Sequence, residues 1–263
     1  MVKAQGISMG SKRLHEKEGS RMNYIYGPVK SRRLGESLGI ITTPYKYCSL
    51  NCIYCQLKKT TKFTIERKEY VKPQALLLEL AQFLKDYPDC ADIDYITLSG
   101  SGEPLLNSKV KNIISGIRAL TSLRIAVITN SVLLSDARTR SDILDADLIV
   151  PSLDAFTQEV FEEIDRPFND SIKIEDIIGG LIALRREFTG KIWLEIMLIK
   201  DINDDVAYMK EFKDIIEKIN PDKIQLNVPS RPPAESWVKI PSLDKLKKIQ
   251  ALLGERCELL LSE

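Results

Sequence analysis

Residues 39–56 read Gly-Ile-Ile-Thr-Thr-Pro-Tyr-Lys-Tyr-Cys-Ser-Leu-Asn-Cys-Ile-Tyr-Cys-Gln. The β-branched run Gly39–Thr43 predicts a strand, which the following proline ends. Cys48, Cys52 and Cys55 come directly after it with the spacing C-x3-C-x2-C. A strand that runs into a loop of three close thiols indicates an α/β protein with metal or redox chemistry at the end of that strand.

Further along the chain, β-branched runs alternate with amphipathic helical patterns. Five more strands are predicted, at Asp94–Ser99, Arg124–Thr129, Asp147–Leu153, Lys191–Ile199 and Lys223–Val228. Apolar residues at helical spacing predict helices within 76–84, 110–117, 174–184 and 209–219, and a last helix at Leu243–Leu253 that stops at Gly254. Asn203 or Asp204 is the expected cap of the fourth helix, and Pro221 is expected to end it.

This order of elements constrains the fold. Six β–α units in succession imply parallel strands joined by right-handed crossovers. Six strands are too few for a closed eight-stranded barrel, so a partial barrel or an open doubly wound sheet remains. In either fold, polar residues at the carboxyl ends of the strands should line the active site.

Composition excludes several classes of protein. The formal net charge of +1 argues against binding nucleic acid through bulk charge, although a local basic patch remains compatible with it. His15 is the only histidine, which removes zinc–histidine hydrolases and Ser-His or Cys-His triads. No apolar run approaches the ~20 residues of a membrane helix, and no secretory signal is evident. The odd, clustered set of five cysteines favours a reducing cytoplasm.

The first residues differ in character from the rest of the chain. Residues 1–21 are polar and without apolar periodicity, and are expected to form a mobile leader; the alternative is that they pack over an open barrel edge. Residues 22–263 are expected to form one domain, and Met22 is a candidate for the natural start.

The three clustered thiols point to an iron–sulfur site. A cubane has four irons, so three cysteine ligands leave one iron open to bind a small molecule. A zinc site would require a fourth ligand, which only Cys90 or Cys257 could supply.

The cysteine spacing, with Tyr54 just before Cys55, resembles the motif of the radical S-adenosylmethionine (radical SAM) superfamily. The resemblance implies a partial (β/α)6 TIM-like barrel and a [4Fe–4S] cluster on Cys48, Cys52 and Cys55. It also implies that S-adenosylmethionine chelates the open iron, with Tyr54 near its adenine. An external one-electron donor, of the flavodoxin or ferredoxin kind, would drive its cleavage to a 5′-deoxyadenosyl radical that abstracts hydrogen from a substrate.

The strand ends carry further candidate ligands of this cofactor. Gly100, Gly102 and Glu103 resemble the superfamily's Gly-Gly-Glu motif, which places the carboxylate near the methionine ammonium group. The positions of Asn130, Ser152 and Asp154 commonly contact the ribose or the methionine carboxylate in that family; the alternative for Asp154 is a helix cap.

One charged residue interrupts an apolar strand. Glu195 must face a polar interior or pair with a cation, because burying an unpaired carboxylate is costly. Arg166 is a candidate partner, or else a clamp for a carboxylate.

Two segments suggest a subgroup of the family. Tyr26–Gly39 and Leu226–Glu235 look like those of small radical SAM proteins related to the enzyme that builds the tricyclic wyosine base in tRNA. That enzyme has a second cluster on upstream cysteines, whereas this chain has no cysteine before Cys48. Basic residues in the two segments are candidates for binding a phosphate or carboxylate of the substrate, namely Arg32, Arg33 and Arg231.

The sequence therefore predicts a radical SAM oxidoreductase or transferase that acts on a substrate such as a tRNA base. Two alternatives stay open. One is an activase that places a radical on a partner protein or peptide. The other is a non-catalytic module that binds an iron–sulfur cluster or zinc.

Overall fold

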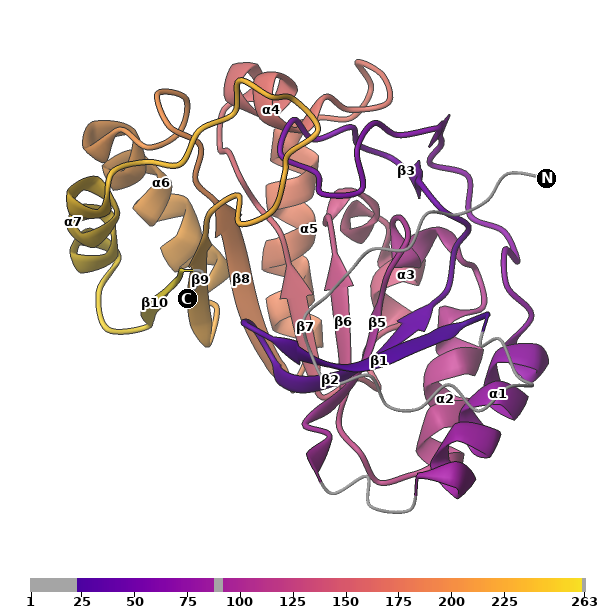
Figure 1. Ribbon diagram of the computed structural model, residues 1–263. Helices are drawn as coiled ribbons and strands as arrows, with labels where there is room; N and C mark the ends of the chain where they lie inside the picture. The colour runs from indigo at the N-terminus through magenta and orange to yellow at the C-terminus, as the bar shows by residue number, and fades with distance from the viewer. Residues whose placement is uncertain (1–22, 88–91, 262–263) are drawn as a thin grey trace.

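A computed structural model describes residues 23–87 and 92–261 of the chain. The leader predicted at 1–21, Met22 and Cys90 lie outside these residues. One eight-stranded sheet with the order β1-β2-β5-β6-β7-β8-β9-β10 forms the centre (Figure 1). The sheet curls into a partial barrel, and from β2 to β10 every neighbouring pair of strands is parallel.

The six predicted strands are confirmed, although the first begins earlier than its apolar run. They are β2 (Gly35–Ile41), β5 (Tyr95–Ser99), β6 (Ile125–Thr129), β7 (Leu148–Pro151), β8 (Lys191–Met197) and β9 (Lys223–Asn227). Two strands of this sheet were not predicted, β1 (Ile25–Ser31), which is antiparallel to β2, and β10 (Cys257–Leu260). Neither has a recognisable pattern, because β1 contains Gly27-Pro28 and β10 is only four residues long.

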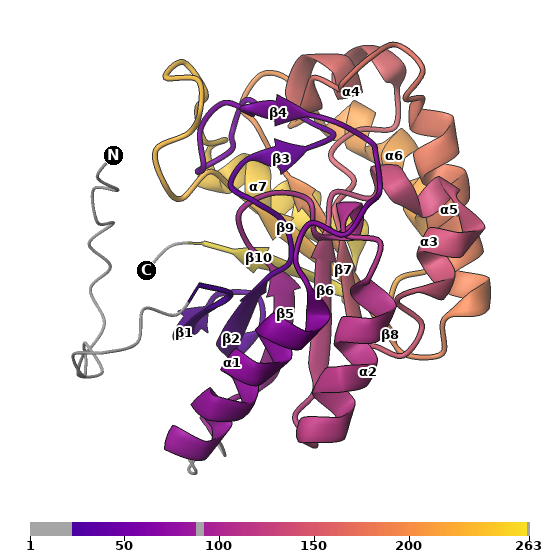
Figure 2. The ribbon, with the colours of Figure 1, turned by 90° about the vertical axis from the view of Figure 1, so that its right-hand side faces the viewer.

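Helices cover the outer face of the sheet (Figure 2). The predicted ones are confirmed as α1 (Pro73–Asp86), α2 (Val110–Leu120), α5 (Ile174–Glu187), α6 (Val206–Ile219) and α7 (Leu243–Leu253). Their branched aliphatic side chains form the main core with the outward-facing side chains of the strands. The predicted N-cap of α6 was wrong by one residue, because Asp205 accepts the hydrogen bonds from the first turn. At the other end of α6, Asn220 is the C-cap and has a left-handed φ of 51°.

Short elements occupy the carboxyl end of the barrel. They are β3 (Tyr47–Cys48) and β4 (Lys62–Phe63) of the cysteine loop, the 3-10 helices η2 (Pro104–Leu106) and η3 (Val132–Ser135), α3 (Ala137–Ser141) and α4 (Gln158–Asp165). In Figure 1 the strands β5 to β7 point toward this end, and β3 and α4 lie above them. The connections after the strands therefore converge there, as expected for a parallel barrel.

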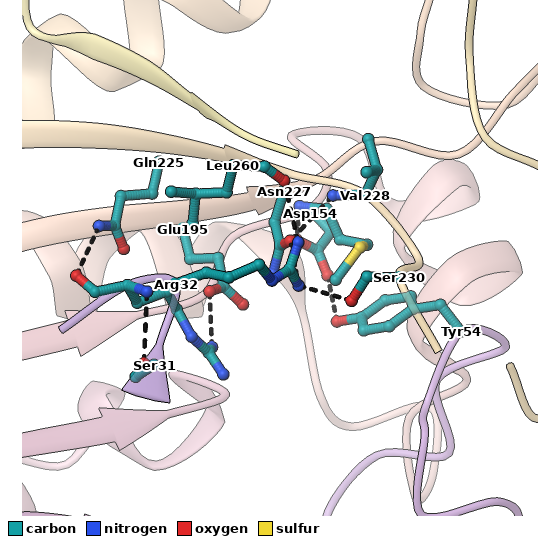
Figure 3. Close-up of polar contacts among 12 residues, drawn as sticks. Ser31, Arg32, Tyr54, Asp154, Glu195, Gln225, Asn227, Val228, Ser230 and Leu260 are labelled. Carbon is teal, nitrogen blue, oxygen red and sulfur yellow. Dashed lines mark hydrogen bonds and ion pairs between the residues drawn. The ribbon is translucent and has the colours of Figure 1, made fainter. Parts of the chain in front are cut away.

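The turn between β1 and β2 reaches across the inside of the curl to its far strands. Arg33 forms an ion pair with Glu195 of β8 (Nη1–Oε2 2.6 Å), and its carbonyl accepts from Gln225 of β9 at 3.3 Å. Arg32 donates to the carbonyl of Leu260 in β10 at 3.0 Å (Figure 3). These contacts hold the hairpin against the open side of the sheet, where the edge strands β1 and β10 are not paired with each other.

The expectation that Glu195 pairs with a cation is confirmed, but the partner named for it was wrong. Arg166 lies elsewhere, at the C-terminal cap of α4, where its backbone is left-handed. Its Nη1 forms an ion pair with Glu235 Oε1 at 2.6 Å. Arg33 takes its place because the β1–β2 turn, which the sequence pattern did not reveal, enters the barrel interior.

Among the described residues no helix has the length and apolar character needed to span a membrane.

Candidate functional site

The cysteine loop is docked onto the turn that follows β5. The amide of Glu103 donates to the carbonyl of Tyr47 at 2.9 Å, and the amide of Lys46 donates to the carbonyl of Ser101. Gly102 makes this contact possible, because a Cβ at that position would lie 2.1 Å from the Tyr47 carbonyl oxygen. Gly100, with φ of 123°, turns the chain just after the strand. Gly102 therefore permits the close approach of the two backbones, and Gly100 permits the turn that precedes it.

A second set of backbone contacts fixes the other side of the loop to α4. The amide of Asn51 donates to the carbonyl of Asp165 at 2.9 Å, and the amide of Ile53 donates to that of Ile164 at 2.9 Å. The loop is thus held between β5 and α4, and its sulfurs have fixed neighbours.

Each cysteine sulfur has a different polar neighbour. The Asn130 side-chain amide donates to Cys48 at 3.4 Å, and the Lys46 ammonium donates to Cys55 at 3.2 Å. The Asp165 carboxyl is the polar neighbour of Cys52, and its charge raises the pKa of that thiol in addition to burial. Burial raises the pKa of Cys48 to about 12 and that of Cys52 well above its ordinary value, so these thiols hold their protons unless a metal replaces them.

The described residues contain no group of three His, Cys, Asp or Glu side chains arranged as ligands of a single metal ion. A mononuclear zinc site would need a fourth ligand beside the three cysteines. Cys257 cannot serve as its fourth ligand, because it is buried in β10 at the sheet edge, whereas the cysteine loop lies over β5 and α4.

Glu103 is buried beside the cysteine loop. Its carboxylate accepts hydrogen bonds from the Thr129 hydroxyl (2.7 Å), the Asn130 amide (2.8 Å) and the Leu105 amide (3.0 Å). These donors favour the charged form, but burial has the larger effect and raises the pKa of Glu103 to about 7. No cation forms an ion pair with it among the residues that the structure describes. A ligand with an ammonium group would complete this environment.

The side chains of Tyr54 and Asp154 connect the cysteine loop to the carboxyl end of β7. The Tyr54 hydroxyl donates to Asp154 Oδ2 at 2.5 Å (Figure 3). The amide of Met197 donates to the other carboxylate oxygen of Asp154 at 2.7 Å. Burial and the nearby Asp165 carboxylate raise the pKa of Asp154. The alternative of Asp154 as a helix cap is wrong, because α4 begins four residues later, after Thr157.

A pocket of about 270 Å³, including its part open to solvent, lies between the loop, the strand ends and helices α4 and α5. Tyr54, Asn130, Ser152 and Asp154 are among its lining residues. Residues predicted from two separate strand ends, those of β6 and β7, and from the cysteine loop thus meet in one place.

The residues present fit an iron–sulfur cluster with a cationic ligand. Lys46 and Asn130 offer N–H donors to two of the sulfurs, which suits thiolates better than thiols. The buried carboxyls of Glu103, Asp154 and Asp165 all have raised pKa values because burial disfavours their charge. Bound positive charge would offset that cost.

Three contributors to this site were missed at the level of sequence, Lys46, Thr129 and Asp165. Thr129 could have been found, since it precedes Asn130 at the same strand end. Lys46 stands among polar loop residues and Asp165 among acidic residues of α4, so nothing in the local pattern distinguishes them.

Comparison with known proteins gives consistent results. The model of the Radical SAM superfamily matches residues 42–217. GTPase Obg of Brachyspira hyodysenteriae is 39% identical over 235 residues, which are 89% of this chain but only 34% of that protein. A UPF0026 protein of Methanocaldococcus jannaschii is 35% identical over 234 residues, covering 89% of this chain and 72% of the relative.

A solved structure of TYW1 with a lysine–pyruvate adduct has the same fold, with a TM-score of 0.57 at 16% identity, covering 84% of this chain and 74% of that one. The name GTPase stays with the relative from Brachyspira, since this sequence contains no G-x4-G-K-[ST] phosphate loop.

Proposed function

Because this chain belongs to the radical SAM superfamily, we propose that it is an enzyme whose residues Cys48, Cys52 and Cys55 hold a [4Fe–4S] cluster with one open iron. When bound, this cluster supplies the electron that cleaves S-adenosylmethionine to methionine and a 5′-deoxyadenosyl radical, which takes a hydrogen atom from the substrate. An external flavodoxin- or ferredoxin-like protein is the electron donor in this proposal. Residues 22–263 act as its single catalytic domain.

One observation carries the proposal: the cysteine loop is fixed against a buried carboxylate that has no cationic partner among the described residues. Glu103 is 2% exposed, and its amide binds the carbonyl of Tyr47, the neighbour of Cys48. Glu103 would bind the methionine ammonium group of S-adenosylmethionine, which would supply the missing cation. A ligand held there lies beside the cysteine that begins the cluster motif.

The remaining pocket residues orient the nucleoside part of the cofactor. Tyr54, Asn130, Ser152 and Asp154 line the pocket. In this proposal Tyr54 would lie near the adenine, and the other three would offer polar groups to the ribose and to the methionine carboxylate. Asp154 also fixes the tyrosine ring through the 2.5 Å hydrogen bond, so the adenine site and the ribose site are coupled.

The first experiment is anaerobic reconstitution with iron and sulfide, followed by dithionite and S-adenosylmethionine and an assay of 5′-deoxyadenosine. We expect product from the native chain and none from Cys52→Ala, which lacks one ligand. A native protein that contains four irons per chain but binds no S-adenosylmethionine would refute the proposal and favour a non-catalytic iron–sulfur module.

We further propose that the substrate is a base of RNA, with a tRNA base as the leading candidate. The two segments that resemble wyosine-forming proteins meet at the mouth of the barrel, where Arg32 donates to Ser230 at 2.7 Å (Figure 3). Arg231 extends from the second segment to Gln56, next to Cys55, at 2.6 Å. The hydrogen-bond acceptors of Arg32 are neutral. Burial lowers the pKa of Arg32 most, repulsion from the guanidinium groups of Arg33 and Arg231 lowers it further, and the Glu195 carboxylate acts in the opposite direction. A phosphate group would relieve this repulsion.

Isotope transfer distinguishes the candidate substrates. Total tRNA and total peptide from cells grown in heavy water carry deuterium on carbon, and the enzyme would move one such atom into 5′-deoxyadenosine. We expect a mass increase of one deuterium with the tRNA and none with the peptide. Transfer from the peptide alone would instead favour an activase that places a radical on a polypeptide.

A further inference from the structure

Lys46 is a buried lysine that points at one of the three cysteines. Its side chain is almost fully enclosed, with 2% of the residue exposed, and its Nζ lies 3.2 Å from Cys55 Sγ. Within residues 23–87 and 92–261, no Asp or Glu forms an ion pair with this ammonium group. Its only hydrogen-bond acceptor in that part of the chain is the cysteine sulfur.

A buried ammonium group requires an anion, because removing it from water is costly unless a charge compensates for it. A neutral thiol is a weak acceptor and carries no charge. A thiolate that belongs to a cluster is both a good acceptor and an anion. The position of Lys46 is therefore explained by a negatively charged ligand set at Cys55 and its neighbours.

The backbone of Lys46 is shaped to present this side chain inward. Its φ of 59° lies in the left-handed region, which is unfavourable for a residue with a Cβ. The conformation is held from both sides, since its amide binds the Ser101 carbonyl and its own carbonyl accepts from the Lys62 amide at 3.1 Å.

We infer that Lys46 raises the reduction potential of the cluster by holding a positive charge and an N–H donor on the Cys55 sulfur. Reduction adds one negative charge to the cluster, and a cation within hydrogen-bond distance stabilises the reduced form more than the oxidised form. Lys46 acts through Cys55 and touches neither substrate nor S-adenosylmethionine in this inference. The inference rests on the proposed cluster at the three cysteines.

The test is a potentiometric titration of the reconstituted full-length protein without S-adenosylmethionine, with the reduced cluster followed by electron paramagnetic resonance. We expect Lys46→Met to reduce the equilibrium constant for electron uptake about tenfold, which is 59 mV for a one-electron couple. Lys46→Arg should recover most of the potential because it keeps the charge and the donors. A Lys46→Met cluster with four irons and an unchanged or raised potential would overturn the inference.

Lys58→Met is the matched control. Lys58 belongs to the same loop and also has a left-handed φ, but its ammonium donates to the carbonyls of Pro232 (3.3 Å) and Pro233 (3.0 Å). Removal of this charge should change the equilibrium constant less than threefold. An equal effect of both substitutions would show that any nearby charge suffices and would overturn the specific role of Lys46.

A measurement on the native sequence covers the case in which Lys46→Met fails to assemble. Protein labelled with lysine carrying 15N at Nζ should show a magnetic coupling between this nitrogen and the reduced cluster, and absence of the coupling overturns the inference. Failure of the native chain to assemble any cluster would instead refute the proposed function, so the two failures are distinguishable.

Discussion

Substitution of Gly102 by alanine tests how the cysteine loop depends on the turn after β5. A Cβ at this position would lie 2.1 Å from the Tyr47 carbonyl oxygen and 3.0 Å from its carbon, both of which are backbone atoms that cannot rotate away. The loop must retreat by roughly 1 Å to restore normal contact, and such overpacking costs about 1–3 kcal/mol. The retreat also weakens the 2.9 Å hydrogen bond from Glu103, which contributes about 1 kcal/mol.

We therefore expect Gly102→Ala to lose about 2–4 kcal/mol, or roughly 5–15 °C in melting temperature for a chain of this size, and to bind less iron because Cys48 moves with Tyr47. Gly179→Ala is the control, since a Cβ there meets nothing within 4 Å and alanine favours helix α5 by about 0.5–1 kcal/mol. Calorimetry of the apo protein and iron content after reconstitution measure both effects. A Gly102→Ala protein with native melting temperature and four irons per chain would refute the reasoning.

Three further predictions concern buried charges. Arg33→Met should destabilise the fold by about 3–5 kcal/mol in urea unfolding by leaving Glu195 unpaired, and the added change Glu195→Gln should recover much of this loss; equal costs for the single and double variants would contradict it. Burial raises the pKa of Glu103 from 4.5 to about 7, so its contribution to apo stability is fully present below pH 4.5 and is lost as pH rises through 7, about 3 kcal/mol in all. The stability difference between native protein and Glu103→Gln should follow that curve in urea titrations from pH 5 to 8, and a difference independent of pH would contradict it. Tyr54→Phe should weaken S-adenosylmethionine binding about tenfold in equilibrium dialysis because Asp154 loses a 2.5 Å hydrogen bond, whereas unchanged affinity would exclude the coupling of the adenine and ribose sites.

Most strands of the barrel could be predicted from the sequence because they are covered on both faces. A fully buried strand must be apolar throughout, as in Leu148–Pro151, and the run between breakers is visible without any alignment. The edge strands β1 and β10 have no such continuous apolar run. Residues 25–31 pair antiparallel to β2 and are partly exposed, and residues 257–260 form a strand mainly because β9 offers its edge. Their structure depends on a neighbour that the local pattern does not encode.

The same distinction holds within the candidate site. The location of Glu103 and Asn130 at the candidate site could be predicted, because each follows a recognisable strand and the ends of parallel strands meet at one edge of the sheet. The predicted membership in the radical SAM superfamily is also confirmed. The pairing of Arg33 with Glu195 joins residues 162 positions apart and depends on how far the β1–β2 turn enters the barrel. Neither the periodicity nor the spacing of residues in the sequence predicts a contact between residues so far apart in the chain.

The charges at the strand ends explain why these side chains are placed together at all. Glu103, Asp154 and Asp165 are buried carboxyls with raised pKa values, and Lys46 is the only lysine among the buried residues of the described chain. Such a set destabilises the empty protein and would be removed by simple selection for stability. It would become favourable once a cationic sulfonium ligand occupied the space beside the carboxyls and the cysteines became thiolates that face the lysine. The cost of the empty site is therefore best understood as a consequence of complementarity to a bound, charged cofactor.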